Sequence, residues 1–301
     1  MRKYIYTLPY QIRSVNKQKD IEEIITQKSS IIMENSPLFA LLKEILCFSN
    51  NQSLDVISLK YKNSLSESKL HQLIDFLEKH NLIYISEELL KKEEIRLVEF
   101  ISQYTTNIQR YLNQIKNLTF QVYSYGENID YLTNVLKGFG IKYNLFDLED
   151  INKFDKNNII LVSINALDLN HLEDLSIKIE NIEGLLWAFT MYYNDSFLLS
   201  PILNQINSTD FNSFKNQIDL KSLNSENCLS KNYLVQNMAV NMMVLEVLTS
   251  IMKLNIQTSY NYMMVYNSAE KEFTREKIYY YPEHSKYKGI ISTIQRWDDE
   301  A

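Results

Sequence analysis

The sequence has little cysteine, proline or glycine: 2, 4 and 5 residues among 301. The two cysteines, Cys47 and Cys228, are far apart and each is isolated, which excludes both a disulfide framework and a CxxC zinc pair. Cys47 stands in the apolar segment LFALLKEILCF and is expected in the core. An abundance of Asn, Ile, Lys and Tyr indicates a compositional bias that weakens any argument from a missing glycine.

The sequence also lacks an excess of basic charge and a long apolar run. Its 31 Lys and Arg residues against 37 Asp and Glu give a net charge of -6, which disfavours binding to nucleic acid or to an anionic membrane. No apolar run reaches the roughly 20 residues of a membrane span, and the first residues show no signal-peptide core. We therefore expect a cytoplasmic protein with no membrane partner.

The chain is long enough for two domains, and its first 86 residues have the pattern of a winged helix-turn-helix. Leu70, Leu73, Ile74 and Leu77 form one apolar face of the third helix. Short β-branched or aromatic runs predict the strands, and serines that can act as N-caps predict the helix starts. The strands are expected at residues 4–9, 22–26, 29–33 and 82–86, and the helices after Ser36, Ser53 and Ser66.

A winged helix often binds DNA, and a DNA-binding regulator is one alternative function. A recognition helix normally presents basic or amide side chains to bases and phosphates. The third helix instead has a nearly balanced set of charges, which disfavours this alternative. The set is Glu67, Asp75 and Glu78 against Lys69 and Lys79.

Residues 87–116 are charged, lack Gly and Pro and are predicted to be a rigid helical joiner. From residue 117 to residue 301 the pattern alternates between strand and helix, which predicts a Rossmann-like α/β domain. A near-continuous apolar run at 157–164 indicates a strand buried in a parallel sheet, and residues 183–203 a strand with a hairpin-like return. Residues 233–254 are apolar on most faces, as in a buried helix.

The segment VYSYGENI is where such a domain would hold a nucleotide. A dinucleotide-binding turn would have glycine at positions 124, 126 and 129, but the chain has Ser124, Gly126 and Ile129. Asp147 lies about twenty residues beyond, where that fold places the acid that binds the ribose. With one motif glycine and no Arg between 121 and 170, we interpret this as a degenerate nucleotide turn that keeps the fold without the ligand.

The order of these elements, with VYSYGENI, LLSPIL, AVNMMVLEVL and YYYPEHSKY, resembles the ThiF-like partner proteins of YcaO-type cyclodehydratases. The family's fold is similar to that of ubiquitin-activating enzymes, and its members serve enzymes that make azoles in ribosomally synthesised peptides. Members often hold zinc with two cysteine pairs. Here Phe211 and Phe214 replace one pair, and His284 and Tyr287 the other. We therefore expect no metal, with Phe211 and Phe214 packed in an apolar core.

The resemblance implies a noncatalytic scaffold without a cofactor, which binds the leader of a precursor peptide and presents its core to a YcaO-type cyclodehydratase that forms thiazoles or oxazoles. It leaves open an azoline dehydrogenase and a homodimer as further partners, and a thiopeptide among the products. An active ATP-dependent enzyme of the ThiF type is the other alternative. The leader would add a strand beside the third strand and lie against the third helix. The implied leader-binding residues are Ser29, Ser30, Ile31, Ile32, Met33, Leu70, Leu73, Phe76 and Leu77.

Overall fold

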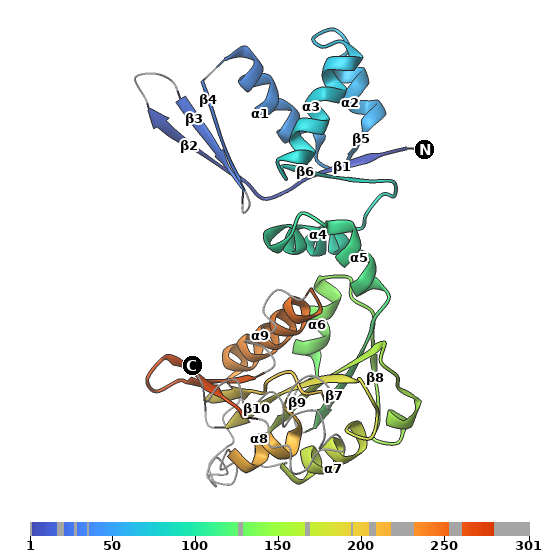
Figure 1. The fold of residues 1–301 in the computed structure, drawn as a ribbon, viewed down its shortest axis with the longest axis vertical. Coiled ribbons are helices and arrows are strands. Elements are labelled where there is room, and N and C mark those ends of the chain that lie inside the picture. Colours follow the sequence, from blue (N-terminus) through green and yellow to red (C-terminus); the bar gives the residue numbers. More distant parts are fainter. Residues whose placement is uncertain are drawn as a thin grey trace, which may run out of the picture. The chain divides into compact units, whose positions relative to one another are not determined.

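The structure is a computed structural model with a mixed α/β fold (Figure 1). The chain forms two compact units, Met1–Gln114 and Ile115–Ala301, which are described separately. The structure describes residues 2–16, 21–26, 29–34, 36–125, 129–165, 169–193, 195–204, 209–217, 232–252 and 261–279.

The first unit contains two antiparallel sheets of three strands, in the orders β5-β1-β6 and β2-β3-β4. Strands β1, β3, β4 and β6 were predicted, whereas β2 and β5 were not. The strands are β1 (Tyr4–Thr7), β2 (Gln11–Asn16), β3 (Ile21–Ile25), β4 (Ser30–Glu34), β5 (Gln52–Ser53) and β6 (Ile83–Ser86).

The three predicted helices are present, and each starts after its predicted serine. The helices are α1 (Pro37–Ser49), α2 (Leu54–Tyr61) and α3 (Glu67–Lys79). The hydroxyl oxygens of Ser36, Ser53 and Ser66 accept hydrogen bonds from the backbone N–H three residues later. Local capping chemistry thus sets where each helix begins.

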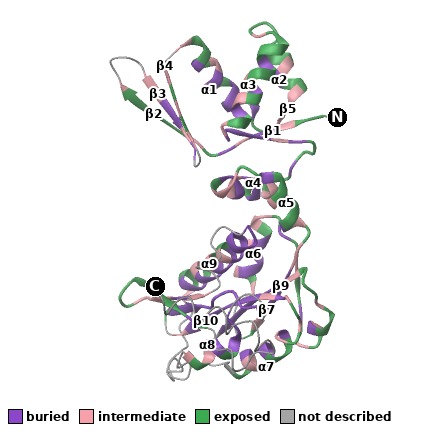
Figure 2. Cartoon of the chain, viewed as in Figure 1, coloured by how far each residue is buried: buried purple, intermediate pink, exposed green. Residues whose placement is uncertain are grey.

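The core of the first unit lies between the three helices and the sheets, where Figure 2 shows the buried positions. Phe39, Leu42, Ile45 and Leu46 place the buried face of α1 there. Cys47 is exposed, so its predicted core position was wrong. Among its neighbours, Ile45 and Leu46 already fill the inward face of that helical turn, which directs Cys47 to solvent.

The predicted helical joiner forms two helices, α4 (Lys92–Tyr104) and α5 (Ile108–Lys116), which are separated at residues 105–107. Contacts within the first unit hold the start of this segment. The backbone N–H of Leu90 donates to the Tyr6 hydroxyl at 2.6 Å, and the Asn81 side-chain amide donates to the Ser102 carbonyl at 3.3 Å. The segment up to residue 114 is therefore part of this unit.

The second unit is built on one sheet of seven strands in the order β13-β12-β11-β10-β9-β7-β8. Strands β8, β7, β9 and β10 are parallel, and β11, β12 and β13 continue the sheet antiparallel. Strands β12 and β13 were not predicted. The strands are β7 (Thr119–Tyr125), β8 (Tyr143–Leu145), β9 (Asn158–Asn165), β10 (Leu186–Tyr193), β11 (Ser196–Leu199), β12 (Tyr262–Asn267) and β13 (Glu272–Lys277).

Helices cover both faces of this sheet, with α6 and α9 on one face and α7 and α8 on the other (Figure 1). One buried cluster contains Trp187, Phe189, Phe211 and Phe214 and lies on the side of α7 and α8. The elements are α6 (Asp130–Gly138), the 3₁₀ helix η1 (Asp150–Lys153), α7 (Leu169–Ile179), α8 (Phe211–Gln217) and α9 (Tyr233–Ile251).

Helix α9 is, within the described residues, the one helix long and apolar enough to cross a membrane. Most of it is buried in the second unit, which confirms the prediction of a buried helix.

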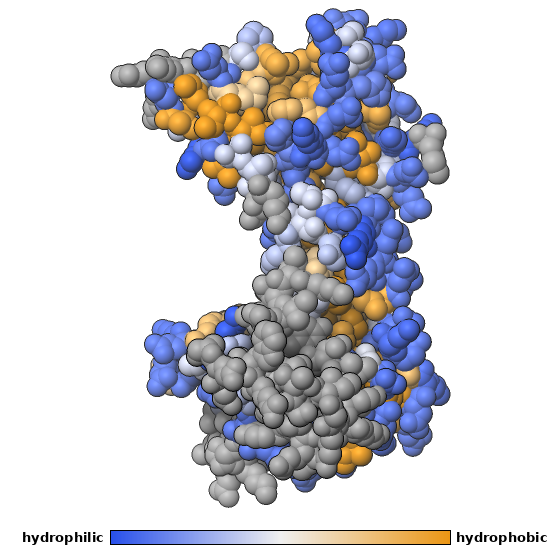
Figure 3. All heavy atoms as spheres, viewed as in Figure 1, coloured by the Kyte–Doolittle hydropathy of each residue, from blue (hydrophilic) through white to orange (hydrophobic). Residues whose placement is uncertain are grey.

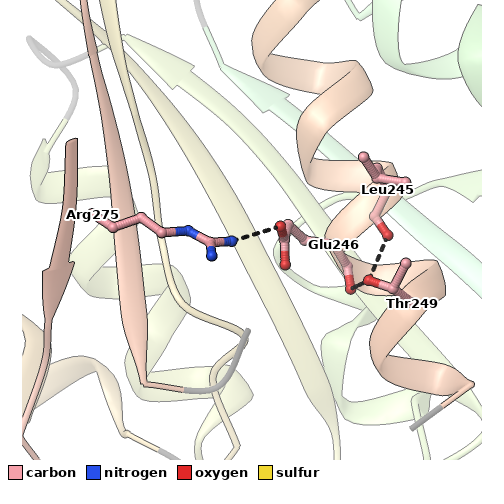
Figure 4. Close-up of polar contacts among 4 residues, drawn as sticks. All are labelled: Leu245, Glu246, Thr249 and Arg275. Atoms are coloured by element: carbon pink, nitrogen blue, oxygen red, sulfur yellow. Dashed lines mark hydrogen bonds and ion pairs between the residues drawn. The ribbon is translucent and has the colours of Figure 1, made fainter. Parts of the chain in front are cut away.

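Asn232 caps the start of α9 by accepting from the N–H groups of Leu234 and Val235. Figure 4 shows how α9 is tied to β13: the Arg275 guanidinium lies 3.3 Å from the Glu246 carboxylate, and the Thr249 hydroxyl bonds back to the carbonyls of Leu245 and Glu246.

Candidate functional site

Strand β4 has a free edge in the described part of the chain, because β3 is its only strand partner there. The Thr26 N–H donates to the Ser29 carbonyl at 2.8 Å, which makes Thr26 and Ser29 a hydrogen-bonded pair. Such pairs alternate along an antiparallel ladder, so Ile31 and Met33 also direct their backbone groups to β3. The backbone N–H and C=O groups at the free edge therefore belong to Ser30, Ile32 and Glu34.

The side chains of β4 divide into two faces. Ile31 and Met33 are half-buried against the core of the first unit, whereas Ile32 points away and is 62% exposed. Figure 3 shows apolar atoms gathered over this region of β3, β4 and α1. Half-buried apolar side chains beside an unpaired strand edge are the two features that an added peptide strand uses.

Helix α3 supplies the other wall. Leu73 and Phe76 are half-buried against the same core as Ile31 and Met33. Leu70 and Leu77, also predicted to line the site, are 3% and 0% exposed and are core residues. The apolar groove is defined as the surface lined by Ile31, Met33, Leu73 and Phe76.

One hydrogen bond joins the segment before β4 to the end of α3. The Ser29 hydroxyl donates to the His80 carbonyl at 3.3 Å, and the His80 ring packs on Phe76 with centroids 4.5 Å apart. The start of β4 and the end of α3 are therefore joined at Ser29 and His80.

The second candidate site is the carboxyl edge of the parallel strands. The chain leaves β7, passes through α6 to β8 on one side, and returns to β9 on the other, which makes a switch point between β7 and β9. Ligands of open α/β sheets bind at such points. Ser124 ends β7, Ile129 immediately precedes α6, and Asp147 follows β8 beside the end of β7. Gly126 lies outside the described residues.

Side chains of the protein occupy this edge. The Tyr125 ring at the end of β7 stacks on the His171 ring near the start of α7, with centroids 3.8 Å apart. Asp130 places a carboxylate in the first turn of α6, where a phosphate would otherwise meet the positive end of the helix. A ligand with several phosphates would meet this fixed negative charge.

Two lysines of the η1 and α7 region are engaged within the protein. The Lys153 ammonium lies 2.6 Å from the Asp150 carboxylate, and the Lys178 ammonium donates to the Leu148 carbonyl at 3.3 Å. The ion pair lowers the pKa of Asp150 and raises that of Lys153.

The segment of Phe211 and Phe214 is apolar and aromatic. Phe211 and Phe214 are 1% and 0% exposed and pack with Trp187 and Phe189, which confirms their predicted packing. Among the described residues, no three His, Cys, Asp or Glu side chains come together as a metal site. His284 and Tyr287 lie outside the described residues, as does Cys228.

No protein-family model matches the chain. An uncharacterized protein of Borreliella burgdorferi is 27% identical over 175 residues, which are 57% of this chain and 17% of that protein. The chain thus spans less than a fifth of the length of this relative.

Solved structures share the fold over nearly the whole chain. A heterocyclase in complex with substrate and cofactor has a TM-score of 0.63 at 8% identity, covering 93% of this chain and 38% of that one. The heterocyclase TruD has a TM-score of 0.60 at 12% identity, covering 98% of this chain and 44% of that one. E. coli MccB with AMPCPP and MccA has a TM-score of 0.55 at 15% identity, covering 94% of this chain and 98% of that one. The chain therefore has the fold of MccB over nearly all of that protein, and of less than half of each heterocyclase.

Proposed function

We propose that this chain is a noncatalytic scaffold of ribosomal peptide modification. Its first unit is a winged-helix domain that binds the leader of a precursor peptide, and its second a degenerate Rossmann-like domain of the ThiF type. A separate YcaO-type cyclodehydratase then forms thiazoline or oxazoline rings on the presented core with loss of one water per ring, and an azoline dehydrogenase oxidises these rings to thiazoles or oxazoles. The observation that carries this proposal is the free edge of β4 beside the apolar groove.

Peptide capture follows from the physics of that edge. An added strand pairs its backbone with Ser30, Ile32 and Glu34, and alternate side chains enter the groove. Backbone pairing supplies affinity for any extended segment, and the groove adds selectivity. Leu70 and Leu77 support the groove from the core without touching the peptide.

The absence of catalysis is supported by the carboxyl edge of the second unit. The stacked Tyr125 and His171 rings and the Asp130 carboxylate lie where a nucleotide enzyme needs open space and positive charge. A separate catalytic partner is supported by the extent of the structural likeness. More than half of each heterocyclase chain has no counterpart in the matched fold.

A proline at the strand edge tests the proposed pairing. Ile32→Pro removes an N–H that faces the free edge and leaves the β3–β4 ladder intact, so leader affinity should fall at least about tenfold. Fluorescence anisotropy with a labelled leader peptide measures this. The matched control is Ile12→Pro, because Ile12 faces the opposite free edge of the same sheet. Equal effects of the two prolines would place the peptide elsewhere.

Groove side chains provide an independent test. Burying a large apolar side chain is worth about 1.5 to 3 kcal/mol, so Leu73→Ala or Phe76→Ala should weaken leader binding about ten- to a hundredfold. Leu59→Ala is the control, because Leu59 is 75% exposed on α2. Circular dichroism checks that each variant is folded. Unchanged affinity in both groove variants would contradict the assigned site.

An ATP-dependent activating enzyme is the second candidate, favoured by the likeness to MccB, one structure of which contains AMPCPP. Calorimetry with ATP separates the two candidates. The scaffold should give no binding heat, and micromolar binding would reject the noncatalytic proposal.

A further inference from the structure

We propose that the apolar groove selects a leader segment that carries an acidic residue beside two alternating apolar residues, and that Lys69 of α3 recognises this acid. The inference rests on the proposed function and specifies the chemistry of its peptide.

The charges of α3 nearly cancel in sum but are segregated around the helix. At 100° per residue, Lys69 falls between Leu73 and Phe76 on the flank that lines the groove. Two of the three carboxylates of the helix fall on the opposite flank, beyond the buried residues, and the third, of Asp75, falls about 100° from Phe76 on the solvent side. The two on the opposite flank belong to Glu67 and Glu78.

Lys69 is available to a peptide. Its side chain is exposed, and it forms no ion pair with another described residue. The acid–base contact that α3 makes within itself, between His71 and Glu67 at 4.0 Å, lies on the opposite flank. On β4, Glu34 belongs to the outward face with Ile32, whereas the inward positions are the uncharged Ile31 and Met33. On β3, Glu22 lies opposite Met33 and is already paired with the Lys43 ammonium at 2.7 Å. Among the described residues, Lys69 is therefore a cation on the groove side without a paired carboxylate.

The position of Lys69 along the groove sets the spacing of the peptide residues. Two inward side chains of an added strand, two residues apart, face the half-buried Ile31 and Met33 of β4 and Leu73 and Phe76 of α3. Lys69 lies one helical turn beyond Leu73, away from the end held by Ser29 and His80. The next inward residue of the peptide therefore reaches Lys69, and Glu or Asp is the complementary choice.

The test uses the full chain and labelled ten-residue peptides that contain Leu-Ser-Leu, followed or preceded two residues away by Glu, Gln or Lys. Both directions are made because the strand can add in either sense. In one direction the Glu peptide should bind about 3- to 10-fold more tightly than the Gln peptide, and the Lys peptide most weakly. Lys69→Glu should reverse this order. The matched control Lys79→Glu should preserve it, because Lys79 lies outside the groove flank.

The outcomes separate this inference from the function on which it rests. Equal binding of the Glu, Gln and Lys peptides, with loss of binding when both leucines become Ser, would overturn the acid selectivity and leave leader capture intact. If Lys69→Glu does not change the order of affinities for the three peptides, the acid selectivity is likewise overturned and leader capture is left intact. If Leu73→Ala weakens the binding of none of the peptides, both the acid selectivity and the proposed leader capture are overturned.

Discussion

Glu180 at the end of α7 has a carboxyl group largely removed from water. Loss of hydration raises its pKa from the ordinary 4.5 to about 7, against the opposing effect of the Phe211 N–H, which donates to the carboxylate at 2.6 Å. The negative charge of Asp210 raises it further. The first turn of α8 is thus held by two carboxylates, since Asp210 also accepts from the Ser213 N–H at 2.7 Å.

The raised pKa of Glu180 makes stability depend on pH. Between about pH 4.5 and 7 the folded protein keeps a proton that the unfolded chain has released, so the free energy of unfolding falls as pH rises. We expect a loss of about 2 kcal/mol between pH 5 and pH 8, allowing for partial exposure. Glu180→Gln should remove most of this slope in urea titrations, and the exposed Glu183→Gln should retain it. Identical slopes in all three proteins would assign the titration to another group.

The aromatic cluster of the second unit offers a test of packing. Phe214→Ala opens a cavity beside Phe189 and Phe211 and should lower the free energy of unfolding by about 3 to 5 kcal/mol. Phe273→Ala should cost about 1 kcal/mol, because Phe273 is 49% exposed. Urea denaturation followed by tryptophan fluorescence measures both. A small loss for Phe214→Ala would mean that α8 does not contribute to the core.

Among the elements, α9 depends on one cap because its side chains provide little charge at either end. Asn232 satisfies two N–H groups of the first turn, and Asn232→Ala should lower the free energy of unfolding by about 1 kcal/mol. Asn232→Asp keeps the side-chain acceptor and should change the free energy of unfolding little. Thermal denaturation compares the three proteins, and equal melting temperatures would indicate that the cap is dispensable.

The pairing of β4 with β3 determines which position of β4 can be changed to proline without disturbing the sheet. Ile31 and Ile32 are adjacent and chemically identical, yet Ile31 pairs inward with Ile24 and Ile32 lies at the free edge. A proline at 31 would break the β3–β4 ladder and disturb the first unit, whereas a proline at 32 tests the peptide alone.

At the scale of the whole molecule, the proposed scaffold has to meet the enzyme that performs the chemistry. We expect a stable complex with a YcaO-type cyclodehydratase that survives size-exclusion chromatography. Heterocycle formation on a leader-bearing peptide should require this chain, as followed by the loss of 18 Da per ring in mass spectrometry. Full conversion without the chain would reject the scaffold role.

Local chemistry in the sequence determined where α1, α2 and α3 begin, because Ser36, Ser53 and Ser66 cap them through bonds that span three residues. Apolar runs likewise determined the buried strands β9 and β10. Only tertiary structure revealed β2 and β13, whose exposed and mixed polar segments become strands by pairing with β3 and β12. It alone separated the core residues Leu70 and Leu77 from the groove residues Leu73 and Phe76, because burial depends on which elements pack against a helix, which its own periodicity does not specify.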